Sequence, residues 1–494
     1  MISNKLLESI PSGLAAAAIE AAELIRGAPS VAIASHIDAD GISAAAIADS
    51  ALKRQGIRVE IEFFKKLDED AVKLIKSKGA DVAWFTDFGS GSLSKIGSMK
   101  AIVSDHHVPE TGYGSNARKG QALLSDFSSV VHVNPQSHGI SGASELSGAG
   151  ATFLVALAMN NENARLIHLA ILGAVGDLQD QRTRRLEGLN RKLVAYATQA
   201  GLIEPLEDIR YFGRETRPIH KLLEYSSDPF VPRISGNEDG AIAFLLELGI
   251  ELKDGEAWRT WAGLSLEEKH KIITALQDHL LSYKRRPEVI ERLVGEVYVL
   301  PKEQKGTPVR DAKEFATLLN ACGRHGQAQI GLKICEGDRG EFLAQGMTLL
   351  RDHRSAISKA LTWARGSGII RLRNIQFFDA GDEIEDTIVG TVAGMLLGSE
   401  GADRTAPMVA FAESTEYSEQ PKTKASARGT QELVSRGLDL SNAIRTAAEK
   451  VGGMGGGHNI AAGATIPSNR RDEFLSALDD IVGSQIIRPL QRRG

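Results

Sequence analysis

The N-terminal part of the chain alternates between short apolar runs and longer segments that carry apolar residues at helical spacing. Runs rich in Val, Ile, Ala and Phe predict buried strands at residues 30–35, 58–64, 81–86 and 100–104. Helices are predicted at residues 42–55, 68–79, 147–159 and 164–175. Strands that alternate with helices of about 10 to 15 residues indicate βαβ units, whose strands form a parallel sheet. We therefore predict an α/β fold with a parallel sheet over residues 1–201.

The pattern changes twice further along the chain. Residues 202–293 are punctuated by proline and then helical, which predicts a mostly helical connecting region. From residue 294 onward strand and helix patterns alternate again, and they end in the glycine-rich run VGGMGGGHNIAAGATIP. This pattern favours a second α/β domain over residues 294–494.

Composition narrows the class of protein only moderately. The chain has 494 residues, of which 42% are hydrophobic and 24% charged. No apolar run approaches the length that spans a bilayer and no signal segment is evident, so we expect a cytoplasmic protein without a membrane partner. The net charge of −5 argues against a protein coated in basic charge for duplex DNA, although a local basic groove is compatible with it. Cys322 and Cys335 have no CxxC spacing, so two free thiols are expected.

Acidic and imidazole side chains follow the apolar runs in four places. These candidate metal ligands are His36, Asp38 and Asp40 in HIDADG, Asp87 after WFT, Asp105-His106-His107 after KAIVS, and Asp177 in GAVGD. In an open parallel sheet, positions just after the strands lie at the edge where ligands bind. Carboxylates and imidazoles that converge there suit two divalent ions. The clusters together therefore predict phosphoester hydrolysis at a two-metal site.

Each cluster also has a simpler interpretation. In an extended segment His36, Asp38 and Asp40 would share one face, whereas an Asp in this position can simply cap the next helix. Asp177 ends an apolar helix, where an acid is unfavourable and asks for a partner such as a metal. In the tripeptide, one His can bind metal and the other a phosphate, with Asp105 orienting an imidazole. The alternative for either His is an ordinary surface loop.

A second set of candidate residues lies near the C-terminus. The run GGGHNIAAGA contains Gly456, Gly457 and His458, and backbone amides of such a run can approach an anion closely. The alternative is an ordinary glycine-rich turn. Ser426 and Arg428 lie upstream, on an expected strand of the same domain, and can hold another phosphate.

These residues resemble the DHH phosphoesterase superfamily, whose motifs match the four clusters in order. Within it the chain is similar to the archaeal branch of the RecJ single-strand exonucleases, through FGRETRPIHKLLEYSSDPFVP, ELSGAGATF and FATLLNACGRHG. The resemblance implies a DHH domain over 1–201, a connecting region over 202–293 and a DHH-associated nucleic-acid-binding domain over 294–494. It also implies a catalytic cleft between the first and last of these.

The resemblance further implies a role for each candidate residue. His36, Asp38 and Asp87 would hold one Mn²⁺ or Mg²⁺ ion. Asp40, Asp87, His106 and Asp177 would hold the other, so that Asp87 bridges the two ions. Asp87, Asp105 and His107 would take part in catalysis, with His107 on the scissile phosphate. The nucleic-acid backbone would be held by Ser426, Arg428, Gly456, Gly457 and His458. Bacterial RecJ proteins usually have Asp where His36 stands, which leaves the metal preference open.

The activity that this resemblance implies is a metal-dependent exonuclease on single-stranded DNA or RNA, in DNA replication or repair. Polarity, the choice between DNA and RNA, the metal and the oligomeric state stay open. One alternative is a phosphodiesterase for short oligonucleotides or cyclic dinucleotides. Another is a mainly structural replisome factor that binds the GINS complex and the replicative helicase.

Overall fold

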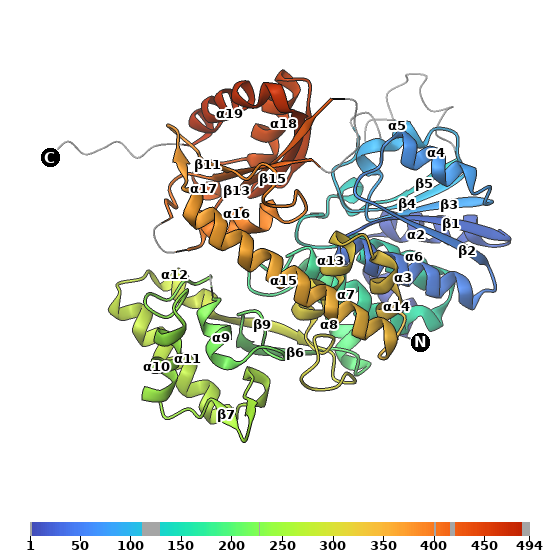
Figure 1. Cartoon of the computed structure of the whole chain (residues 1–494). Coiled ribbons are helices and arrows are strands. Elements are labelled where there is room, and N and C mark those ends of the chain that lie inside the picture. The colour runs from blue at the N-terminus through green and yellow to red at the C-terminus, as the bar shows by residue number, and fades with distance from the viewer. Residues whose placement is uncertain (1, 111–128, 227, 400–401, 415–419, 487–494) are drawn as a thin grey trace. The chain divides into compact units, whose positions relative to one another are not determined.

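The computed structural model describes residues 2–110, 129–226, 228–399, 402–414 and 420–486. The chain divides into two compact units, one formed by Met1–Leu223 with Ile242–Leu350 and the other by Glu224–Ala241 with Arg351–Gly494 (Figure 1). The domain boundaries at residues 201 and 293 remain predictions. No helix in the described ranges is both long and apolar enough to cross a membrane.

The first unit contains a five-stranded parallel sheet, as the alternating pattern predicts. Its strands lie in the order β2-β1-β3-β4-β5 and every pair is parallel. Their bounds are β1 Ser30–His36, β2 Arg58–Phe64, β3 Val82–Thr86, β4 Ala101–Ser104 and β5 Val130–Val133. β1, β3 and β4 are buried on both faces apart from the half-buried His36, which explains their continuous apolar character.

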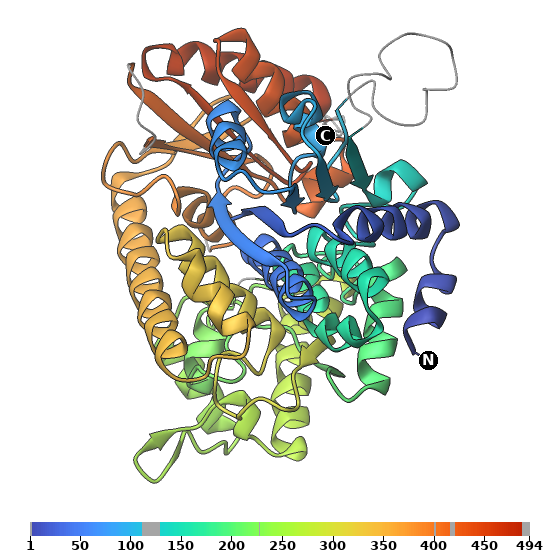
Figure 2. The ribbon, with the colours of Figure 1, turned by 90° about the vertical axis from the view of Figure 1, so that its right-hand side faces the viewer.

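Alternate residues of each strand pack into separate hydrophobic clusters on the two faces of the sheet. In β1, Val31 and Ile33 join the large cluster that includes helices α2, α3, α6 and α7, whereas Ala32 and Ala34 join the smaller cluster with α4 and α5. Figure 2 shows the ribbon in the same colours after a turn of 90° about the vertical axis. Their bounds are α2 Ser12–Ile25, α3 Ala39–Arg54, α4 Glu69–Ser77, α5 Leu93–Ile96, α6 Gly148–Met159 and α7 Ile167–Gly176.

Helix α3 is the centre of the large cluster. Almost all of its side chains are buried, and it contacts both α6 and α7. It begins at Ala39, three residues before the predicted start at residue 42, because the Asp38 carboxylate accepts a hydrogen bond from the Gly41 amide at 3.0 Å and caps the helix. The capping interpretation of Asp38 is therefore correct, and it places Asp40 in the first turn of α3.

The remaining elements of the first unit surround this core. β9 pairs antiparallel with β6, so the strand predicted to open the last domain packs within the first unit. The helices include α13 and α14, which contact α3. The bounds are α1 Ile2–Ser9, α8 Gly188–Gln199, β6 Glu204–Ile209, α9 Ile219–Glu224, α10 Glu238–Glu247, β7 Lys253–Asp254, β8 Ala257–Trp258, α11 Leu266–Ser282, α12 Pro287–Ile290, β9 Val294–Val299, α13 Ala312–Arg324 and α14 Ala328–Cys335. The end of α9 and the start of α10 fall within Glu224–Ala241, which belongs to the second unit.

The second unit is built on a six-stranded sheet in the order β10-β11-β12-β13-β15-β14. One face packs against α18 and α19 and the other against α16, with separate hydrophobic clusters (Figure 1). The long helix α15 leads into this unit. The bounds are α15 Glu341–Ser367, β10 Ile370–Arg371, β11 Gln376–Asp379, α16 Val389–Leu397, β12 Met408–Glu413, β13 Lys422–Arg428, α17 Gln431–Ser435, α18 Leu440–Lys450, β14 Met454–Gly457, β15 Ala461–Pro467 and α19 Arg471–Gln485.

Candidate functional site

The predicted metal ligands of the first unit come together at the carboxyl edge of its parallel sheet. His36 is the last residue of β1, Asp87 follows β3 and Asp105 follows β4. The strands are in register at this edge, since Ser35 pairs with Thr86 and Thr86 with Ser104. Three consecutive strands in the sheet therefore deliver polar side chains at the same level.

One group of candidate ligands consists of His36, Asp38 and Asp87. One ligand atom from each lies within 4.8 Å of the others. His36 Nδ1 is 2.9 Å from Asp38 Oδ2 and 3.7 Å from Asp87 Oδ2. His36 and Asp38 are half-buried and Asp87 is buried. This group can hold one divalent ion through two carboxylates and an imidazole.

A second group consists of Asp40, His106 and Asp177, again with ligand atoms within 4.8 Å. His106 Nε2 is 3.7 Å from Asp40 Oδ2 and 3.3 Å from Asp87 Oδ1, so Asp87 lies between the two groups. His106 Nδ1 is 3.8 Å from Asp177 Oδ2. Asp177 caps the C-terminal end of α7, where the sequence places it.

The prediction that His36, Asp38 and Asp40 share one face of an extended segment is wrong. The strand ends at His36 and helix α3 begins at Ala39, so these residues do not follow a two-residue repeat. As a result Asp38 lies with His36, whereas Asp40 turns toward His106. The tight turn from strand into helix separates the two carboxylates into different groups.

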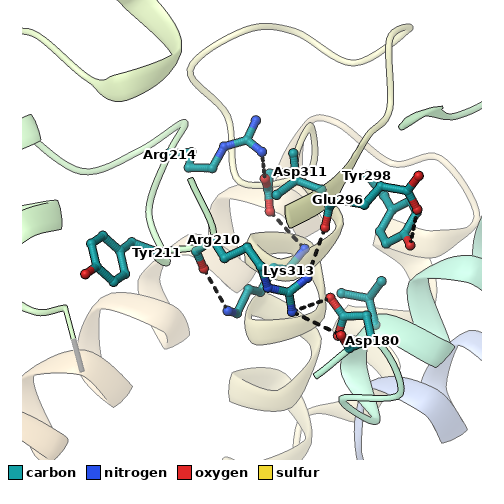
Figure 3. A pocket seen from close by; sticks show the side chains of 10 residues that line it. Asp180, Arg210, Tyr211, Arg214, Glu296, Tyr298, Asp311 and Lys313 are labelled. Atoms are coloured by element: carbon teal, nitrogen blue, oxygen red, sulfur yellow. Dashed lines mark hydrogen bonds and ion pairs between the residues drawn. The ribbon is translucent and has the colours of Figure 1, made fainter. Parts of the chain in front are cut away.

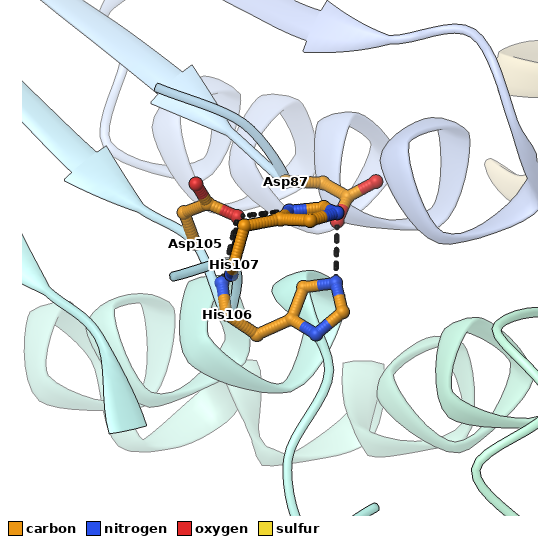
Figure 4. A group of neighbouring side chains, drawn as sticks. All are labelled: Asp87, Asp105, His106 and His107. Carbon is orange, nitrogen blue, oxygen red and sulfur yellow. Dashed lines mark hydrogen bonds and ion pairs between the residues drawn. The ribbon is translucent and has the colours of Figure 1, made fainter. Parts of the chain in front are cut away.

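The Asp105 carboxylate holds the tripeptide in place (Figure 4). It accepts a hydrogen bond from His107 Nδ1 at 2.8 Å, and backbone amides of Ser90, His106 and His107 donate to it at 2.9, 2.7 and 3.2 Å. Asp105 is fully buried, whereas the His107 side chain is 46% exposed. Asn134 also donates to the His107 carbonyl at 2.8 Å. The imidazole of His107 is thus oriented from inside while one side faces solvent.

Two glycines that the sequence analysis did not single out make room for the carboxylates. The amides of Gly148 and Ala149, at the start of α6, donate to Asp40 at 2.7 and 3.0 Å. A Cβ atom at Gly148 would lie 2.4 Å from Asp87 Oδ1, and one at Gly173 would lie 2.1 Å from Asp40 Oδ1. Gly148 belongs to the segment ELSGAGATF, which supplied a sequence signal without revealing this role.

Helix α13 fixes the turn between His36 and α3. Asn320 Oδ1 accepts a hydrogen bond from the Ala39 amide at 2.9 Å. A Cβ atom at Gly323 would lie 1.8 Å from the Ile37 carbonyl oxygen, so only glycine allows this approach. Burial lowers the pKa of Arg324, and the charge of the Asp38 carboxylate opposes that shift. These residues lie in the segment NACGR and were also missed as site residues.

Burial and neighbouring charges shift the pKa values within the cluster. Burial raises the pKa of Asp40 well above its usual value, and the charge of Asp87 raises it further. Burial alone would lower the pKa of His106, but the surrounding carboxylates, that of Asp177 foremost, raise it well above its usual value. Burial would raise the pKa of Asp105, yet His107 holds it below its usual range. Such a concentration of negative charge attracts protons or cations.

The residues present fit divalent metal ions. The donor set consists of carboxylates and imidazoles, which bind Mn²⁺ and Mg²⁺-type ions in proteins. Asp87 is 1% exposed, and among the described residues its Oδ1 atom receives no hydrogen bond, although it lies 3.3 Å from His106 Nε2. A buried carboxylate oxygen without a donor is costly unless a cation satisfies it.

The candidate phosphate-binding residues of the second unit lie on β13 and β14 and in the turn after β14, and both strands pair with β15. Ser426 on β13 pairs with Gly463 on β15, which pairs with Gly456 on β14. Arg428 is the last residue of β13, and Gly457 ends β14 with a φ of 139°. These side chains and amides therefore lie on one part of the sheet.

The turn after β14 and the start of helix α16 complete this region. His458 is exposed, and its amide donates to the Ala461 carbonyl at 2.8 Å, which closes the turn into β15. Gly390 in α16, another residue that was missed, faces Arg428, since a Cβ atom there would lie 2.4 Å from Arg428 Nη2.

Several known protein domains and solved structures are similar to this chain. A DHH-CID domain model matches residues 211–294 and a DHHA1 domain model matches residues 373–484. The two matches cover 196 of the 494 residues and support the resemblance to the DHH superfamily. An uncharacterized protein of Methanocaldococcus jannaschii is 28% identical to this chain over 463 residues, which cover 92% of this chain and 94% of the relative.

Solved structures show the same fold. RecJ of Thermus thermophilus, in complex with Mn²⁺, matches with a TM-score of 0.56 at 17% identity, over 96% of this chain and 56% of RecJ, so this chain spans little more than half of that protein's length. CDC45 from Entamoeba histolytica matches with a TM-score of 0.61 at 10% identity, over 94% of this chain and 97% of CDC45. An exonuclease RecJ bound to manganese matches with a TM-score of 0.53 at 16% identity, covering 94% of both chains. The predicted α/β fold class and DHH resemblance are confirmed.

Proposed function

We propose that this chain hydrolyses phosphodiester bonds of single-stranded DNA or RNA from an end, with two divalent ions. The observation that carries the proposal is the meeting of two ligand groups at one buried carboxylate, Asp87. His36 and Asp38 would hold one ion with Asp87, and the other would be held by Asp40, Asp87, His106 and Asp177. Bound ions of this kind lower the pKa of water and neutralise charge on the phosphate.

Side chains next to the ligands would orient the phosphate and donate hydrogen bonds to it. Asp105 accepts the Nδ1 hydrogen of His107 and its charge raises the pKa of that imidazole, so the protonated ring can donate from Nε2 to a phosphate oxygen. We propose His107 and Asp105 as catalytic and positioning residues in this sense.

The second unit would bind the strand. Ser426 and Arg428 on β13, the amides of Gly456 and Gly457 on β14 and the side chain of His458 after β14 would offer donors on two strands that both pair with β15, which suits a phosphate backbone. Only 5% of the chain is aromatic, so base stacking would contribute little. Binding should therefore depend on phosphates and weaken with salt.

The proposal is tested with single strands of DNA and RNA labelled at either end, incubated with Mn²⁺ or Mg²⁺. We expect metal-dependent release of mononucleotides, and the labelled end that disappears first gives the polarity. Asp87→Asn should remove the activity. Failure of the wild-type protein to cleave any of these strands with either metal would contradict the proposal. Cleavage of short oligonucleotides or cyclic dinucleotides alone would favour the alternative phosphodiesterase.

The CDC45-like fold favours a second candidate function, a structural role in a replisome. That match covers 94% of this chain and 97% of CDC45. A structural factor would not need a buried carboxylate that lies between two groups of candidate metal ligands, and this argues for the enzyme. The two roles are compatible. Co-purification of the tagged chain with GINS subunits or the replicative helicase would test the partner, and the Asp87→Asn variant would separate binding from catalysis.

A further inference from the structure

Gln179 is a buried residue next to the candidate metal centre, and every polar atom of its side chain is used. It lies two residues after Asp177 and is 2% exposed. Its Nε2 atom donates to the Gly142 carbonyl at 2.8 Å and to Asp177 Oδ2 at 2.9 Å. Its Oε1 atom accepts a hydrogen bond from Asn190 Nδ2 at 2.6 Å. One amide thus connects a candidate ligand to two other parts of the chain.

The Gly142 carbonyl also orients the imidazole of His106. It lies 2.6 Å from His106 Nδ1, and because a carbonyl only accepts, Nδ1 must carry the hydrogen. Nε2, which faces Asp87 and Asp40, then offers its lone pair in the neutral imidazole. A Cβ atom at position 142 would lie 1.9 Å from the His106 carbonyl oxygen, so this close approach requires glycine.

We propose that Gln179 is a positioning residue that sets the spacing between two metal ligands, Asp177 and His106. It holds the Asp177 carboxylate directly and the His106 imidazole through the Gly142 carbonyl. Asn190 fixes which way the amide points, since its donor selects Oε1 and leaves Nε2 for the ligand side. The inference rests on the metal centre of the proposed function and assigns residues that the ligand motifs do not include.

The turn that carries Gln179 is held from its other end as well. Asp180 accepts a hydrogen bond from Arg210 Nη2 at 2.8 Å, and both side chains are 9% exposed (Figure 3). Arg210 Nη1 donates to the Glu296 carbonyl at 3.1 Å. Leu178 has a φ of 58°, a conformation that such a residue adopts only when its surroundings impose it. The turn between Asp177 and Asp180 is therefore tightly constrained.

A purely structural role and a positioning role of the Gln179 amide predict different results. A structural role would lower the thermal stability of the metal-free protein and leave its response to metal unchanged. A positioning role would weaken metal binding itself, because ligands that are no longer oriented must be ordered when the ion binds. Partners that orient metal ligands typically contribute about 10- to 100-fold in affinity.

The test measures Mn²⁺ binding to the full chain by calorimetry, and the rise in Tm that Mn²⁺ causes. Gln179→Met keeps the length of the side chain and removes its donors, and Gln179→Glu keeps the shape but turns an acceptor toward Asp177. We expect both to bind Mn²⁺ about 10- to 100-fold more weakly and to show a smaller rise in Tm. Gln181→Met is the matched control, since Gln181 is exposed and lies two residues away; its Mn²⁺ affinity should equal that of the wild type.

Asn190→Ala provides a second variant that leaves Gln179 in place. It should weaken Mn²⁺ binding in the same direction by a smaller factor, and it decides the question if the Gln179 variants do not fold. Wild-type affinity in Gln179→Met, or in Asn190→Ala when that variant must decide, would overturn the inference. Absence of Mn²⁺ binding by the wild-type chain would instead overturn the proposed function, so the two failures are distinguishable.

Discussion

Nε2 of His106 lies 3.3 Å from Oδ1 of Asp87, and each of the two side chains is only 2% exposed. This contact joins the two ligand groups, because Asp87 also approaches His36 through its other oxygen. Asp87 has a φ of 62°, in the left-handed region that residues other than glycine rarely adopt. The backbone strain and the buried oxygen occur at the same residue, as is common at functional sites.

Replacing Asp87 by Asn is the sharpest test of the bridging carboxylate. Asn tolerates the left-handed backbone, so the fold should persist. We expect hydrolysis to fall by more than about 100-fold, since even the outer partners of metal ligands contribute about 10- to 100-fold. Rates on a labelled single strand measure this. Asp70→Asn, at an exposed acid on α4, should cleave at the wild-type rate; equal activity in both variants would exclude Asp87 as a ligand.

Substitutions of Asp105 and His107 should both reduce turnover, but only the substitution of Asp105 should also lower stability. His107→Gln should reduce turnover and leave thermal stability nearly unchanged, because this side chain is 46% exposed. Asp105→Asn should also lower the free energy of unfolding, by about 1–3 kcal/mol, because an amide cannot accept all the hydrogen bonds that the carboxylate receives. Denaturant titrations and initial rates test both variants. Equal stability of the two would show that Asp105 is not the buried anchor described here.

Removal of divalent ions should destabilise the first unit. Asp40, Asp87 and Asp177 repel one another without a cation, and an ion that binds only the folded state at about 100 times its Kd stabilises it by about 2.7 kcal/mol. We therefore expect EDTA to lower the Tm and excess Mn²⁺ to restore it. Calorimetry with and without chelator measures the shift. If neither EDTA nor excess Mn²⁺ changes the Tm, the cluster binds no ion in the folded chain.

The pH dependence of stability should contain a contribution from His132. Burial lowers its pKa to about 4, and Ser90 Oγ lies 2.8 Å from its Nε2 atom. The unfolded chain binds a proton near pH 6.5 and the folded chain only near pH 4, so this contribution is complete above pH 6.5 and falls as the pH drops toward 4. The slope is at most about 1.4 kcal/mol per pH unit. His132→Gln should flatten the curve of unfolding free energy over that window, and an unchanged slope would contradict the assignment.

Arg428 should contribute to strand binding through a phosphate. Arg428→Gln is expected to weaken binding of single-stranded DNA regardless of sequence and to reduce the slope of log K against log salt by about 0.7. Gly390→Ala should have a similar effect, because its added Cβ would lie 2.4 Å from Arg428 Nη2 and displace the end of a flexible side chain. Fluorescence anisotropy at several salt concentrations measures both. Arg445→Gln, at an exposed arginine on α18, is the control and should keep the wild-type slope.

The positions of the ligand clusters could be predicted because a local rule governs them. Apolar runs that alternate with helices specify a parallel sheet, and polar residues just after such runs reach the same edge. The residues that position these ligands could not be predicted, because their role depends on distant contacts. Gly148 donates to Asp40 across 108 positions of sequence, and Asn320 accepts from Ala39 across 281. Nothing near these residues in the sequence indicates their partners.

The sequence by itself determined which chemical groups are available and at which strand ends they stand, from HIDADG to the tripeptide at Asp105. The tertiary structure decided how those groups are divided. Because α3 begins at Ala39, side chains after that point follow a helical repeat rather than the two-residue repeat of a strand. Asp38 therefore stays with His36, while Asp40 turns toward His106 and Asp177. The amide of Gln179, which holds the latter pair, acts through contacts that form only when the chain is folded.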